Sequence, residues 1–232
     1  MNNNQWDGFS RQQLARLGRE YMLFAQFNSR TGYAALQMNH GPEAYLDVAI
    51  ENWMAVSPVY TQRMQKAMGF AGKKDVATIF KGLQLECGLS HQYFDAHFEI
   101  LSADKGRFWL ASCGPLLETE PRGDVAVKTM CHDIEDPTFD ATAVATNPRA
   151  RMRPVHRPPR LPTHQGSHCE WDVFIDYEAE PLVETAVTGV MRGSQLASLH
   201  IKRPRSSEPG VWITTMGRWW NRYSWSNFPM RH

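Results

Sequence analysis

Three of the four cysteines lie in short segments at the boundaries of predicted elements, and in two of these segments an adjacent histidine could activate the thiol. The segments are Ser112-Cys113-Gly114-Pro115, Met130-Cys131-His132-Asp133 and His168-Cys169-Glu170-Trp171. A thiolate is a strong nucleophile and a soft metal ligand once its pKa is lowered, and an adjacent histidine is one means of lowering it. The pattern is therefore compatible with a cysteine nucleophile, with a metal site, and with cysteines that only fill space.

Cys131 is the first candidate for the nucleophile, ahead of Cys113 and Cys169. His132 follows it directly and could accept the thiol proton, and an acidic residue comes next to orient the histidine. Two observations oppose this choice: adjacent side chains on a helix point about 100° apart, and acidic neighbours raise the pKa of a thiol. His168 and His97, arriving from the predicted strands, are the alternative bases. The predicted chemistry is attack of a thiolate on an electrophilic carbon of a small substrate.

A pocket without catalysis is the second interpretation. Free cysteine is among the most buried residue types, so the thiols could be packing residues around a bound hydrophobic ligand. The chain has 8 tryptophans and 11 methionines, which suit a large and adaptable apolar cavity. Phe98, Trp109 and Trp171 are expected to line it, and Cys87 is expected only to pack.

A metal site is the third interpretation. His97, Glu99 and His132, together with the cysteines, supply ligand types that suit zinc or iron. No tight motif such as C-x-x-C or H-E-x-x-H is present. His97 and Glu99 share one face of a predicted strand, which a solvated face explains equally well. The first expectation is therefore that no cofactor is needed.

Helices dominate the first part of the chain. Apolar residues at three- and four-residue spacing predict four helices between residues 10 and 88, which start at Ser10, Pro42, Pro58 and Asp75. Each start carries a residue that favours a helix N-terminus. These helices are expected to form a support for the strands that follow.

Alternating apolar and polar residues then predict a hairpin over residues 93–113. A two-residue turn would pair Phe98 with Ala111 and place Trp109 and Cys113 on the face of Phe98. The later expected elements are short helices at 123–133 and 138–146, a proline- and arginine-rich extended connection at 147–166, a strand at 168–176 and a helix at 183–200. On the last strand, Cys169 and Trp171 face the same way.

The predicted fold class is α+β: a helical N-terminal half packed on a small antiparallel sheet, with an aromatic-rich C-terminal extension. The parts are a helical region at 1–88, an α+β core at 89–182 and a C-terminal helix with a tryptophan-rich tail at 183–232, within one domain. Four tryptophans of the tail are expected to cover a second subunit, so a homodimer is predicted.

Composition restricts the partners. The 25 Lys and Arg residues nearly balance the 24 Asp and Glu residues, so no basic field favours nucleic acid. No apolar run approaches the roughly 18 residues that span a membrane. The N-terminus lacks the basic-then-apolar pattern of a signal peptide, and four cysteines are too few for a disulfide scaffold. A cytoplasmic location is therefore expected, with a small molecule as substrate or ligand.

The order of these features resembles a known family. It runs through a helical half, an alternating hairpin, Cys-Gly-Pro, Cys-His-Asp, a proline-rich span and a strand with His-Cys-Glu-Trp. Over roughly residues 40–178 the chain is similar to the L-2-amino-thiazoline-4-carboxylic acid hydrolase family, and more distantly to 4-vinyl reductase-type ligand-binding domains. The family's Cys-Pro segment occurs here with a glycine inserted. The resemblance implies an α+β fold, and either hydrolysis of a C–N or C–S bond in a small heterocycle or binding of a small hydrophobic ligand.

Overall fold

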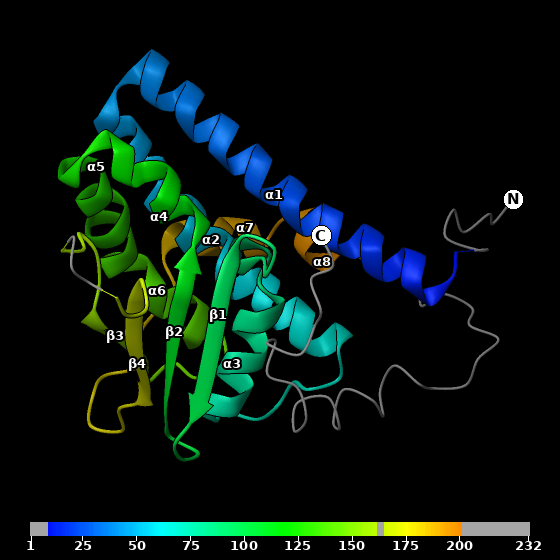
Figure 1. The fold of residues 1–232 in the computed structure, drawn as a ribbon. Helices are drawn as coiled ribbons and strands as arrows, with labels where there is room; N and C mark the ends of the chain where they lie inside the picture. The colour runs from blue at the N-terminus through cyan, green and yellow to red at the C-terminus, as the bar shows by residue number, and fades with distance from the viewer. Residues whose placement is uncertain (1–8, 162–164, 201–232) are drawn as a thin grey trace, which may run out of the picture.

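A computed structural model describes residues 9–161 and 165–200, and within them it has a helical half packed on a four-stranded antiparallel sheet (Figure 1). The α+β class predicted from the sequence is therefore confirmed. The strands follow the order β1-β2-β4-β3 across the sheet. Among the described residues, no helix is both long enough and apolar enough to cross a bilayer.

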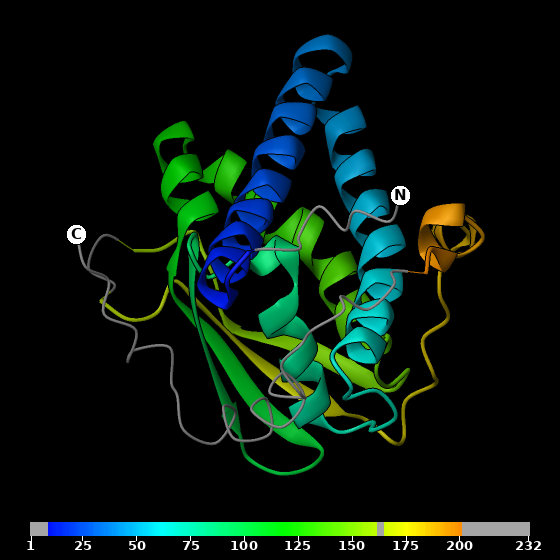
Figure 2. The same cartoon turned by 90° about the vertical axis from the view of Figure 1, so that its right-hand side faces the viewer.

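Two long helices form an antiparallel pair that extends beyond the sheet (Figure 2). Helix α1 covers Arg11–His40 and helix α2 covers Pro42–Ala67. Ser10 begins α1 as predicted, since its hydroxyl accepts from the backbone of Gln13 at 3.2 Å and the Gln13 side chain accepts from the Ser10 backbone at 2.8 Å. Gly41, at φ 90°, separates the two helices.

Helix α2 does not end at Pro58, so the predicted restart of the chain there is wrong. A proline inside a helix removes the N–H that the carbonyl four residues earlier would accept, here the carbonyl of Met54. The hydroxyl of Thr188 donates to that carbonyl at 2.7 Å, and the Thr188 side chain comes from helix α7. The partner that makes the proline tolerable is thus distant in the sequence.

Shorter elements complete the fold. They are α3 (Val76–Leu85), η1 (Cys87–Leu89), β1 (Phe94–Ile100), β2 (Lys105–Cys113), α4 (Gly114–Thr119), η2 (Glu120–Arg122), α5 (Asp124–Lys128), η3 (Thr129–Ile134, a π-helical turn), α6 (Glu135–Val144), β3 (Ala150–His156), β4 (Cys169–Ile175), α7 (Ala186–Arg192) and α8 (Gln195–Ser198). Asp75 caps α3 as predicted: its carboxylate accepts from the Thr78 backbone at 2.9 Å. The helices predicted at 123–133 and 138–146 form a continuous path through α5, η3 and α6.

The hairpin register differs from the prediction. Phe98 lies opposite Phe108 rather than Ala111. An irregularity between residues 95 and 96 shifts the pairing by one more residue at the start of β1 and the end of β2. Trp109 consequently faces away from Phe98 and stacks on His97, with ring centroids 5.4 Å apart. Because the side-chain period of a strand is two residues, each slip of one residue exchanges the faces.

Two later elements also differ from the prediction. The connection at 147–166 contains an edge strand, β3, in which Pro154 lies next to a pairing irregularity; edge strands accept a proline because one side of the backbone is unpaired. The helix expected at 183–200 is two short helices that are separated at Gly193 and Ser194. The tryptophan-rich tail lies outside the described residues.

The core lies between one face of the sheet and the helices. Its centre is a stack of aromatic rings: Trp171 of β4 lies parallel to Phe139 of α6, with centroids 4.1 Å apart, and Phe108 of β2 stacks on both. Trp171 is 1% exposed. The predicted inward face of β4, Cys169 to Ile175 in alternation, is confirmed by its burial. This rigid layer holds the ends of β2 and β4 beside the π-helical turn.

Candidate functional site

Three buried cysteines gather at one end of the sheet, and with Glu135 they are here named the thiol cluster. Cys113 ends β2, Cys169 begins β4 and Cys131 lies in the π-helical turn. Their residues are 9%, 6% and 4% exposed. Cys113 and Cys169 raise the pKa of Cys131, and Glu135 raises the pKa of all three, so the four groups act on one another electrostatically.

Strand pairing and helix geometry explain this gathering. Leu110 pairs with Cys169, so the start of β4 lies next to the end of β2, where Cys113 is found. Cys131 and Glu135 are four residues apart on the path from the π-helical turn into α6, a spacing that places side chains on neighbouring parts of a helix surface. Single π-helical turns occur frequently at functional sites.

Glu135 is the site residue that sequence reasoning missed. Burial raises its pKa to about 8, against an opposing effect of the Arg157 guanidinium. A carboxyl with this pKa exchanges its proton near neutral pH, which is the property of a general acid or base. The available signal is its position four residues after Cys131, whereas from the sequence alone the acidic residues here are interpreted as an orienter of His132 and as groups that raise the pKa of the thiol.

The thiols themselves are held neutral. Burial raises the pKa of Cys113 to about 12; the backbone N–H of Leu116 opposes this rise and Glu135 adds to it. Burial, and then Glu135, raise the pKa values of Cys131 and Cys169 further. At neutral pH all three are thiols, so a nucleophilic role requires a base that takes the proton during the reaction.

The predicted histidine bases have other partners. His168, buried, accepts the backbone N–H of Cys113 at its Nδ1, at 2.9 Å. His132 donates from Nε2 to the carbonyl of Pro158 at 2.6 Å, because a carbonyl can only accept. His168 thus positions Cys113, and His132 holds the segment that follows β3.

Gly114 makes room for the ring of Tyr93. Its position beside Cys113 could instead have suggested that a ligand approaches the backbone there. A Cβ at this position would lie 2.3 Å from the ring of Tyr93, so the missing side chain makes room for that ring. The Gly114 N–H also donates to the Tyr93 carbonyl at 2.8 Å. Tyr93 is therefore fixed against the residue that follows Cys113.

Arginine–carboxylate pairs surround the thiol cluster. Arg30 contacts Glu118 at 2.6 Å and Arg160 contacts Glu120 at 2.7 Å, and both arginines lower the pKa of Cys113. Arg157 pairs with Asp136, and it lowers the pKa values of Cys131 and Glu135. Positive charge thus acts on the cluster from α1 and from the segment after β3. The three arginines partly offset the effect of burial on the thiols.

The residues predicted for a metal site or a ligand pocket are dispersed. His97 pairs with Asp95 at 3.0 Å on the face of β1 opposite the core, whereas His132 lies in the π-helical turn. Across residues 9–161 and 165–200, no three His, Cys, Asp or Glu side chains are arranged to hold a metal ion. Of the aromatic residues, Phe98 and Trp171 belong to the core face, and Trp109 lies on the other face.

A second half-buried carboxyl, Glu86, lies in the helical half and was also missed. Ser57 and Thr61 of α2 donate to it at 3.4 and 3.5 Å, and Cys87 donates at 3.8 Å. Burial raises the pKa of Glu86 to about 7, and these donors oppose the rise. Cys87 is half-buried and donates to Glu86, outside the thiol cluster.

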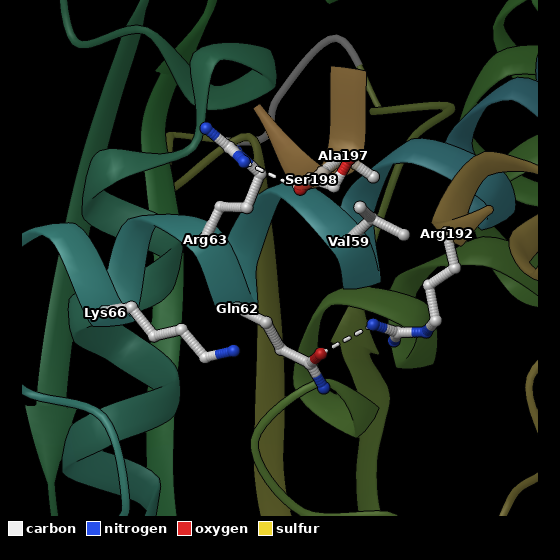
Figure 3. Close-up of a pocket in the computed structure, with 7 residues that line it drawn as sticks. All are labelled: Val59, Gln62, Arg63, Lys66, Arg192, Ala197 and Ser198. Atoms are coloured by element: carbon white, nitrogen blue, oxygen red, sulfur yellow. Dashed lines mark hydrogen bonds between the residues drawn. The ribbon is translucent and has the colours of Figure 1, made fainter. Parts of the chain in front are cut away.

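A pocket of about 140 Å³ lies between α2 and the segment of α7 and α8 (Figure 3). Its lining residues are Val59, Gln62, Arg63, Lys66, Arg192, Ala197 and Ser198. Arg63 donates to the carbonyls of Ala197 and Leu199, and Arg192 donates to Gln62. These bonds attach the α7–α8 segment to α2, and none of the predicted site residues lies there.

Comparison of the chain with protein-family models, with curated proteins and with solved structures finds no match in any of the three.

Proposed function

We propose that this chain is a small-molecule hydrolase in which a thiol of the cluster attacks the carbon of a C–N or C–S bond in a small heterocyclic or amide substrate. The observation that carries the proposal is that three thiols share one core cluster and that Glu135, a half-buried carboxyl, raises the pKa of each of them. The resemblance to the thiazoline hydrolase family supports the same substrate class.

Cys113 is the preferred nucleophile on these grounds, in place of Cys131. The Leu116 N–H and two arginines, Arg30 and Arg160, favour the charged form of its thiol and oppose the effect of burial. His168 fixes its backbone at 2.9 Å. A positioned thiol whose charged form is favoured by its surroundings is the better nucleophile.

Glu135 serves as the proton carrier. In the first step the Cys113 sulfur bonds to the substrate carbon, the thiol proton passes to the Glu135 carboxylate, and the π electrons of the substrate move to its nitrogen or oxygen. Collapse of this adduct breaks the C–N or C–S bond, and Glu135 returns the proton to the leaving atom. Water then hydrolyses the sulfur–carbon intermediate and restores the thiol.

The dependence of kcat/KM on pH tests this assignment, with 2-amino-thiazoline-4-carboxylate and 4-nitrophenyl acetate as probes. Only the carboxylate form of Glu135 accepts a proton, so kcat/KM should rise with pH and level off above about 8. Glu135→Gln should lower the plateau by about 100-fold, within the usual range for a general base. Cys113→Ser should abolish turnover.

Cys87→Ser is the matched control, because Cys87 lies outside the thiol cluster, and it should keep the turnover of the parent protein. A rate that continues to rise up to pH 10 without a plateau would exclude Glu135 as the base. Full turnover in each of Cys113→Ser, Cys131→Ser and Cys169→Ser would exclude thiol catalysis.

The alternative function is a binding module for a small hydrophobic ligand. The raised pKa values of all three thiols favour it, since binding needs no thiolate. Slow and equal alkylation of the cysteines near neutral pH, together with retention of a ligand by each serine variant, would support this alternative over hydrolysis.

A homodimer in a reducing compartment stays a prediction. The four cysteines are unpaired thiols, which a cytoplasmic location would preserve. Helix α1 exposes Tyr21, Phe24 and Phe27 by 56%, 64% and 69%, and exposed aromatic side chains of this kind are typical of interfaces. Sedimentation of the intact chain should give twice the monomer mass; a monomer at all concentrations would contradict the prediction.

A further inference from the structure

Across residues 9–161 and 165–200, four buried side-chain donors have no hydrogen-bond partner, and two of them belong to aromatic residues beside cysteines of the thiol cluster. The hydroxyl of Tyr93 and the indole N–H of Trp171 are both enclosed and unbonded. Such a group costs about 1–3 kcal/mol when it is buried without a partner, so native proteins usually satisfy it. Each of the two lies next to a cysteine of the cluster, which directs attention to a ligand as the missing partner.

Trp171 faces Cys169. Its indole N–H lowers the pKa of the Cys169 thiol, as a donor near the sulfur does, yet no hydrogen bond closes between them. The ring is fixed by its parallel stack on Phe139 at 4.1 Å. The stack therefore holds this donor in place beside the Cys169 sulfur.

Tyr93 faces the Cys113 side of the cluster. Its ring packs on the Cα of Gly114, the Arg30 guanidinium lies 5.0 Å from its centroid, and Cys113 raises its pKa. After burial, the Glu118 carboxylate raises this pKa most, because it is an acceptor close to the hydroxyl, although the pair lacks the geometry of a full hydrogen bond. Tyr93 is thus a rigid hydroxyl donor next to the preferred nucleophile.

We propose that the Tyr93 hydroxyl is a catalytic donor: it hydrogen-bonds the substrate oxygen or nitrogen that gains electron density when Cys113 adds to the neighbouring carbon. This inference rests on the proposed function. A donor that already points to the reacting atom needs no reorganisation as charge develops, and loss of one such donor usually costs about 10²–10³-fold in rate. The charge develops only when sulfur adds to a double bond.

Because charge develops only when sulfur adds to a double bond, two thiol reagents of different mechanism test the role of the Tyr93 hydroxyl. With 4-nitrophenyl acetate, the Cys113 sulfur bonds to the carbonyl carbon, negative charge forms on the oxygen, and 4-nitrophenolate leaves while the thiol proton passes to the base. With iodoacetamide, sulfur displaces iodide and no oxygen gains charge. Tyr93→Phe should slow acylation of Cys113 by about 100-fold and change its alkylation by less than about 3-fold.

Tyr177→Phe is the matched control, because its hydroxyl donates to Asp104 at 2.8 Å far from the cluster in the hairpin turn. It should leave both rates unchanged. Thermal unfolding gives a readout without activity: Tyr93→Phe should be at least as stable as the parent, since it removes an unsatisfied hydroxyl. A loss of stability in Tyr93→Phe would assign its hydroxyl a structural bond instead.

The outcomes separate the two proposals. Equal acylation rates in Tyr93→Phe and the parent, with Cys113→Ser unreactive, would overturn the role of Tyr93 and leave Cys113 as the nucleophile. A parent protein whose Cys113 is not acylated would overturn the proposed function and the role of Tyr93 together. Equal slowing of acylation and alkylation would show that the variant only displaces Cys113, and this would also overturn the role of Tyr93.

Discussion

The free energy of unfolding should fall as the pH rises from about 5 to about 8, because two half-buried glutamates are held in their protonated form. A glutamate in the unfolded chain ionises near 4.5, whereas the pKa of Glu86 is about 7 and that of Glu135 about 8 in the folded protein. Between these values the unfolded chain binds fewer protons, so a higher pH favours unfolding. Both side chains keep some contact with water, and the expected loss is about 3 kcal/mol.

Urea unfolding at pH 5, 6, 7 and 8 measures this dependence. Glu86→Gln and Glu135→Gln should each flatten part of the curve, the first between pH 5 and 7 and the second up to pH 8, since an amide does not titrate. Asp75→Asn is the contrasting variant, because the pKa of Asp75 is lowered by its donors and its stabilising effect is lost only in acid. Stability that increases toward pH 8, with or without the glutamates, would contradict the prediction.

Among substitutions that add one methyl group near the site, Gly114→Ala should lower the free energy of unfolding most. The new Cβ would lie 2.3 and 2.4 Å from ring atoms of Tyr93 and 2.7 Å from its carbonyl oxygen. The Tyr93 ring and carbonyl cannot both move away from the new Cβ, because the Gly114 N–H donates a hydrogen bond to that carbonyl. We expect a loss of about 3 kcal/mol, at the upper end of overpacking, and about a 100-fold slower acylation, because Cys113 and Tyr93 both move.

Gly18→Ala is the control for this substitution. It places the same methyl group on α1, where nothing lies within 4 Å, and it should stabilise the protein by about 0.5–1 kcal/mol because alanine favours a helix. The two variants are compared by urea unfolding and by the acylation rate. Equal stability and equal rates in both would refute the role of Gly114.

Local signals in the sequence predicted the parts of the fold that depend on local bonds. Ser10 and Asp75 begin helices because their side chains accept backbone N–H groups three residues later. Pro58 could not be judged in this way, since the hydroxyl that compensates for it belongs to Thr188. The hairpin register failed for a related reason: the irregularity after Asp95 depends on pairing that alternation does not reveal.

The sequence indicated the candidate cysteines and a thiolate mechanism, but not the protonation states of the groups at the site. In the structure Cys113, Cys131 and Cys169 belong to one buried cluster. Sequence reasoning could not supply the raised pKa values, since these follow from burial among distant elements. For the same reason it could not identify Glu135 as the group that titrates near neutral pH.

The bond between Thr188 and the Met54 carbonyl has an evolutionary consequence. In homologous sequences, position 58 and position 188 should vary together: where proline is kept, position 188 should keep a hydroxyl, and where proline is replaced by a residue with an N–H, the helix satisfies its own carbonyl and the hydroxyl becomes dispensable. Two positions 130 residues apart would then covary in an alignment of homologues. This covariation would indicate that α7 packs on α2 in those homologues as well.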